Sequence, residues 1–145
     1  MRHWMFGALA ALMLTPLAAF AHGEDKPGPH GGVIRMPGAF HTEVVAHGDR
    51  AFHVYLLDVA FKDPVVADST VALWYVAPDG KTVEVGCVKG GDHFGCRLPE
   101  AVPAAPSGAL KLRATRKGLK GSDVSYPLPL KAAVPEQGHH KHDSH

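Results

Sequence analysis

The stretch "FHTEVVAHGDRAFHVYLLD", Phe40 to Asp58, decides the fold. Apolar and polar residues alternate on both sides of the turn-forming Gly48-Asp49 pair, as in two half-buried strands joined by a hairpin. Matching the two apolar faces requires a loop with an odd number of residues, such as residues 48–50, and this register sets His53 opposite Val45. The stretch therefore predicts an antiparallel strand pair with one apolar and one polar face.

The same pattern recurs along the chain. Short apolar or alternating runs rich in Val, Leu, Tyr and Phe are separated by turn residues, and residues 22–145 show no convincing helical period. The runs are residues 32–36, 40–47, 51–61, 69–77, 81–88, 93–98, 109–115 and 124–130. They predict an all-β domain over residues 33–134, a single antiparallel β-sandwich (Ig-like) of seven or eight short strands. Pro127 and Pro129 confine the last run to an edge strand.

The two ends of the chain have other compositions. Arg2, an apolar run and the small residues Ala19 and Ala21 have the pattern of a cleavable signal peptide over residues 1–21. The Gly/Pro-rich residues 22–32 predict a flexible arm, and residues 135–145 predict a disordered His-rich tail. We therefore expect a periplasmic protein that is not inserted in the membrane after cleavage.

Cys87 and Cys96 flank a segment that contains the turn signal Gly90-Gly91, so the two cysteines can face each other across a hairpin. Export to an oxidising compartment favours a disulfide between them, which in the loop-entropy description contributes roughly 2–3 kcal/mol. The alternative is a thiolate metal site that includes His93, although the spacing of the cysteines is not a usual zinc spacing.

Histidine is the unusual component of this chain. There are 11 histidines, whereas 15 basic and 14 acidic residues leave a formal net charge of +1. This balance gives no support for binding to nucleic acid or to anionic membranes. No phosphate-binding glycine loop and no nucleophile elbow is present, so we expect a binding protein and not an enzyme.

The polar face of the opening hairpin is the first candidate metal site. Alternation places His41, Glu43 and His47 on one strand beside His53 and Tyr55 on the other. Imidazoles and a carboxylate within reach of each other suit a borderline divalent metal such as Zn(II) or Cu(II). The alternative is a solvated strand face with scattered histidines.

Further candidate ligands lie outside this hairpin. If the signal peptide is cleaved after Ala21, His22 presents its α-amine and its imidazole together, a pair that chelates Cu(II). The remaining candidates are His30 on the arm, Met36, His93, and the tail residues His139, His140, His142 and His145. Imidazoles and carboxylates favour Cu(II) or Zn(II), with Ni(II) and Co(II) also open, and Met36 leaves an opening for Cu(I).

The segment that runs from Gly28 to Asp58 resembles a known family. Its matching residues are Gly28, Pro29, His30, Gly31, Gly32, Gly38, Phe40, Glu43, Phe52, Val54, Tyr55 and Asp58. It is similar to the N-terminal β-domain of periplasmic adaptor (membrane-fusion) subunits of heavy-metal efflux pumps, and to small periplasmic metal-binding proteins encoded with such systems. The chain has no long helical hairpin and no lipoyl-like halves, so it differs from a full adaptor. The resemblance implies a periplasmic setting, transition-metal handling, a β-sandwich and a ligand role for His30.

Together these observations predict a periplasmic divalent-metal-binding protein, a chaperone or buffer in metal resistance whose partners are the metal ion and an efflux adaptor. The alternative is a β-sandwich protein-interaction module whose histidines are incidental or sense pH.

Overall fold

The computed structural model describes residues 26–131, and in this range the chain is all-β, without helices. Its strands are β1 (Val33–Gly38), β2 (Phe40–Ala46), β3 (Ala51–Leu57), β4 (Thr70–Val76), β5 (Thr82–Lys89), β6 (Phe94–Arg97), β7 (Gly108–Arg116), β8 (Leu119–Lys120) and β9 (Val124–Leu128). Each of the eight runs expected from the sequence overlaps one strand, and the ninth strand is the two-residue β8. No helix in the described range could span a membrane. The predicted signal peptide and the predicted tail lie outside the described residues.

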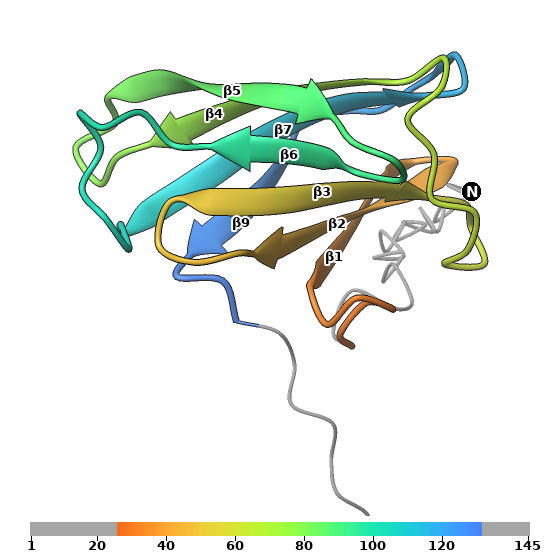
Figure 1. Cartoon of the computed structure of the whole chain (residues 1–145), viewed down its shortest axis with the longest axis horizontal. Coiled ribbons are helices and arrows are strands. Elements are labelled where there is room, and N and C mark those ends of the chain that lie inside the picture. The colour runs from red at the N-terminus through yellow and green to blue at the C-terminus, as the bar shows by residue number, and fades with distance from the viewer. Residues whose placement is uncertain (1–25, 132–145) are drawn as a thin grey trace, which may run out of the picture.

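All strand pairs are antiparallel, and the strand order is β1-β2-β3-β6-β5-β4-β7-β8, with β9 on β7. The first half of β5 pairs with β4 and its second half pairs with β6. This strand therefore joins one layer, made of β1, β2, β3 and β6, to a second layer, made of β4, β7, β8 and β9. Figure 1 shows the sheet curling until β9 lies behind β3 and β6. The expected antiparallel all-β class is confirmed. The sheet, however, is nearly barrel-shaped rather than clearly a sandwich of two separate sheets, because β5 joins the layers.

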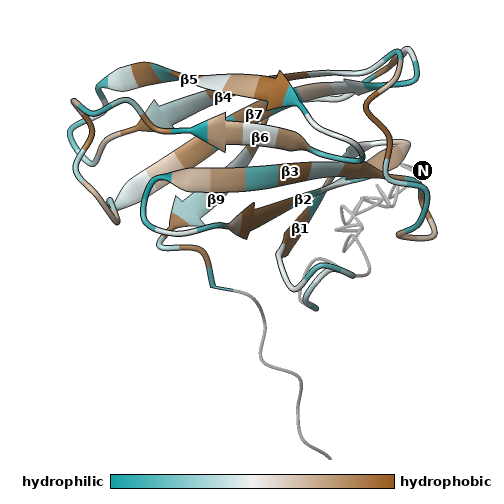
Figure 2. Cartoon of the chain, viewed as in Figure 1, coloured by the Kyte–Doolittle hydropathy of each residue, from teal (hydrophilic) through white to brown (hydrophobic). Residues whose placement is uncertain are grey.

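The register of β2 and β3 agrees with the sequence-based expectation, since Val45 lies opposite His53 and Glu43 lies opposite Tyr55. Along β3, hydrophobic and hydrophilic residues alternate (Figure 2). The inward-facing side chains of Val44 and Val54 are fully buried. The alternation in the sequence therefore gave the core face of this hairpin correctly.

β1, at one end of the sheet order, and β9, which pairs with β7, meet along a seam that hydrogen bonds close. Arg35 Nε in β1 donates a hydrogen bond to the Ser125 carbonyl in β9 (3.1 Å), and Ser122 N donates to the Pro37 carbonyl (2.9 Å). The buried Tyr126 hydroxyl of β9 is hydrogen-bonded to Thr42 of β2. β9 pairs with β7 and is an edge strand, as expected from its prolines. Pro127 has no backbone N–H that could donate a hydrogen bond across the seam.

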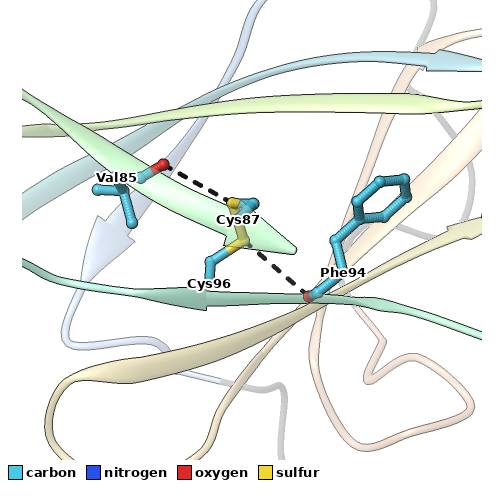
Figure 3. The surroundings of a disulfide bond; sticks show 4 residues. All are labelled: Val85, Cys87, Phe94 and Cys96. Atoms are coloured by element: carbon cyan, nitrogen blue, oxygen red, sulfur yellow. Dashed lines mark hydrogen bonds between the residues drawn. A yellow bond between two sulfur atoms is a disulfide. The ribbon is translucent and has the colours of Figure 1, made fainter. Parts of the chain in front are cut away.

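Cys87 and Cys96 form the disulfide that the sequence predicts. The two residues are directly opposite each other in the β5–β6 pair, and Cys96 belongs to the core. Figure 3 shows the joined sulfurs between the Val85 and Phe94 carbonyls. Since neither cysteine is free, the alternative of a thiolate metal site is wrong.

Candidate functional site

Glu43 is the centre of the candidate site, and it is fully buried on the outward face of β2. One carboxylate oxygen accepts hydrogen bonds from the backbone N–H groups of His30 (2.8 Å) and Gly32 (2.9 Å). The other oxygen is 2.7 Å from Nδ1 of the His30 imidazole. Both oxygens are therefore engaged by protein donors, which explains how a carboxylate can be buried here.

The donors come from the turn at Gly28–Gly32, which folds back over β2. Hydrogen bonds from Gly28 N to Gly32 O and from Gly31 N to Gly28 O close this turn, each 2.9 Å long. A Cβ atom on Gly28 would lie 2.4 Å from Glu43 Cδ, and one on Gly32 would lie 2.6 Å from the Val44 carbonyl. Glycine is thus required by close approach of the turn to the strand, and the arm is packed at this point.

His30 is held in one orientation by two contacts. Its ring stacks on Tyr55 with 3.6 Å between ring centroids and 6° between the ring planes. Its Nδ1 faces the Glu43 carboxylate, which when ionised can only accept a hydrogen bond, so Nδ1 carries the proton. In the neutral ring Nε2 then has the free lone pair, as in carboxylate–histidine–metal arrangements.

Three more imidazoles continue the row of rings, and we call His47, His53 and His93 the histidine stack. The ring centroids of His47 and His53 are 4.6 Å apart, and those of His53 and His93 are 4.2 Å apart. Tyr55 links the stack to His30, since its ring centroid lies 5.3 Å from that of His93. One continuous row of five rings therefore covers the outer face of β3.

Burial favours the neutral form of His53, the middle ring of the stack. Asp92 Oδ1 is 2.8 Å from His93 Nδ1, so His93 has the same carboxylate-bound Nδ1 as His30. That hydrogen bond lowers the pKa of Asp92. Desolvation, together with the neighbouring His93 and His47, lowers the pKa of His53. A neutral imidazole is the form that binds a metal.

His41 lies apart from this row. It is buried, its Nδ1 is 3.0 Å from the Asp58 carbonyl, and its ring stacks on Phe61 at 4.0 Å. The polar face expected from the hairpin is therefore divided. His47, His53 and Tyr55 belong to the row and Glu43 contacts it through His30, whereas His41 packs against a loop.

The remaining candidate metal ligands lie in three different places. His30 and His93 join the row, while Met36 is an exposed residue of β1. His22 and the tail residues His139, His140, His142 and His145 lie outside the described residues. Within residues 26–131, no three His, Cys, Asp or Glu side chains converge as a ready metal site. In the stack the rings lie nearly face to face, so their nitrogens point alongside one another and not at a common point.

Sequence reasoning missed two features of the site, namely the role of Asp92 and the docking of the Gly28–Gly32 turn on Glu43. The signal for the second was available, because glycines flank His30 on both sides at positions where a backbone approaches another closely.

Comparisons with family models, with curated proteins and with solved structures found no match to this chain.

Proposed function

We propose that this chain binds a divalent transition metal, Cu(II) or Zn(II), on the outer face of β2, β3 and β6, and acts as a periplasmic chaperone or buffer in metal resistance. The observation that supports this proposal most strongly is the pair of carboxylate-bound histidines, Glu43–His30 and Asp92–His93, which flank Tyr55 beside His53. Outer-sphere carboxylates of this kind fix the tautomer and the orientation of ligand histidines.

The residues have distinct roles in this proposal. His53, His93 and the exposed His47 are the ligands, and because their rings lie face to face, rotation about their side-chain bonds must bring the nitrogens to a common point when the metal binds. His30 supplies Nε2 from the far side of Tyr55. Glu43 is a positioning residue and not a ligand, because three N–H groups already occupy its oxygens. The imidazole donors suit Zn(II) and Cu(II), and by the affinity order Cu(II) binds more tightly.

Isothermal calorimetry with the full tag-free chain tests the proposal. We expect stoichiometric Cu(II) or Zn(II) binding tighter than micromolar, weakened about tenfold or more by His53→Asn and by His30→Asn. His41→Asn is the matched control, because His41 packs on Phe61 away from the row. A variant in which His139, His140, His142 and His145 are replaced by Asn separates the tail from the row. If only the tail variant loses binding, the row is not the metal site.

The cellular setting is part of the same proposal, and it includes an efflux adaptor as partner. Its support is the signal-peptide pattern of residues 1–21 and the resemblance of residues 28–58 to adaptor β-domains. Amino-terminal sequencing of the exported protein tests the first point, with His22 as the expected first residue. Absence of any metal binding would move the assignment to a protein-interaction module with pH-sensing histidines, for which the close packing of three imidazoles is the supporting observation.

A further inference from the structure

A pocket lies at the open end of the seam between β1 and β9, on a different face from the row of rings. Its volume is about 310 Å³. It is lined by Val33, Arg35, Pro127, Leu128, Pro129 and Lys131. Four of these side chains are apolar and two are cationic, so the pocket combines an apolar wall with positive charge.

Arg35 is held rigidly at this pocket. Its Nε donates to the Ser125 carbonyl and its Nη1 donates to the Ile34 carbonyl at 2.8 Å. Its guanidinium carbon lies 5.3 Å from the centroid of the Tyr126 ring. A guanidinium group has five N–H donors, and among residues 26–131 the others have no acceptor.

Within residues 26–131 the positive charge of the pocket also has no carboxylate partner. Neither Arg35 nor Lys131 forms an ion pair with a carboxylate of the described part of the chain. By contrast, Arg113 on β7 is paired with Asp123 at 2.6 Å. A fixed guanidinium with unused donors recognises carboxylates well, because its planar fork matches the two oxygens and loses little conformational freedom on binding.

We propose that this pocket binds a small carboxylate that carries an apolar chain. The carboxylate contacts Arg35 and Lys131, and the apolar chain lies against Val33, Leu128 and the two prolines. Strand addition is disfavoured at this edge, because Pro127 offers no N–H to an incoming strand. This site is independent of the metal proposal, since it shares no residue with the row of rings.

An NMR titration of the full-length chain with hexanoate tests the proposal, with hexanamide as the uncharged isostere. We expect amide shifts centred on Val33, Arg35 and Leu128, and about tenfold weaker binding of hexanamide, because the charge-assisted bonds are lost. Affinity should rise by up to about fourfold for each methylene from butanoate to hexanoate. A peptide whose C-terminal residue is leucine presents the same carboxylate and apolar side chain. Tighter binding of the peptide than of hexanoate would make a protein C-terminus the better occupant, and weaker binding would favour a small carboxylic acid.

Variants make the test decisive. Arg35→Gln should abolish hexanoate binding. Arg113→Gln replaces an exposed arginine on β7, away from the pocket, and should leave hexanoate binding unchanged. Lys131→Gln breaks no hydrogen bond of the described residues, so it should leave the fold intact and weaken binding about two- to threefold in a salt-dependent manner. Equal affinities for hexanoate and hexanamide, shifts that map elsewhere, or unchanged binding by both the Arg35 and the Lys131 variants would overturn the proposal.

Discussion

Replacement of Glu43 by Gln is the sharpest perturbation of the candidate site. The Gln side-chain oxygen can still accept the backbone N–H groups of His30 and Gly32, so two of the three hydrogen bonds are kept. The third changes its direction, because the Gln amide donates to His30 Nδ1, where the carboxylate had accepted from it. The proton of the neutral imidazole must then move to Nε2, and the lone pair that faced outward is lost.

The expected magnitudes follow from this exchange. One charge-assisted hydrogen bond becomes a neutral one, and the free energy of unfolding should fall by about 1–2 kcal/mol. Metal affinity should fall about 10- to 100-fold, as is usual when the carboxylate behind a ligand histidine is lost. Glu43→Ala, by contrast, leaves two backbone N–H groups and the His30 Nδ1–H without their acceptor, at about 1–3 kcal/mol for each group that stays buried. Its free energy of unfolding should therefore fall further than that of Glu43→Gln, and comparing the two variants separates the effect on folding from the effect on binding.

Three measurements check this prediction: urea unfolding for stability, calorimetry for metal affinity, and imidazole ¹⁵N NMR for the tautomer. The spectrum should show His30 as the Nδ1–H tautomer in the native chain and as the Nε2–H tautomer in Glu43→Gln. Glu84→Gln, at an exposed position of β5, is the matched control and should change none of the three. An Nε2–H tautomer of His30 in the native chain, or full metal affinity in Glu43→Gln, would refute the reasoning.

The remaining predictions concern the disulfide, the turn and the pH dependence of stability. Replacing Cys87 and Cys96 together by Ala should lower the free energy of unfolding by roughly 2–3 kcal/mol, since the bridge closes a loop with a sequence separation of 9; urea unfolding measures this, and an unchanged midpoint would contradict it. Gly28→Ala should displace the turn from Glu43 and weaken metal binding in calorimetry, whereas Gly91→Ala, which has open space around its Cα, should not. The lowered pKa of His53 means that the unfolded chain binds the proton more tightly than the folded chain, so metal-free stability is unaffected above the ordinary value of 6.5 and falls as pH drops below it. His53→Asn should therefore reduce the loss of stability between about pH 7 and pH 5, and an unchanged pH profile would argue against the shift.

Local pattern was enough to predict the strands, the register of the opening hairpin and the disulfide. Each of these features depends on residues close in sequence. Alternation fixes which side chains share a face, and the turn fixes how two neighbouring strands align. Val45 opposite His53 and Cys87 opposite Cys96 follow from such short-range rules.

The site itself depends on contacts that local pattern does not contain. His93 reaches His53 because β6 pairs with β3, which sets Gly95 beside His53 across a long separation in sequence. Glu43, which alternation placed on the polar face as a candidate ligand, is buried because the Gly28–Gly32 turn folds over it. The nearly closed shape of the sheet was decided in the same way, by the pairing of β5 with two partners. The sequence by itself determined which residues face outward together, while only the tertiary structure decided which of them meet, because strand order and the covering of a sheet face are set by the packing of the whole domain.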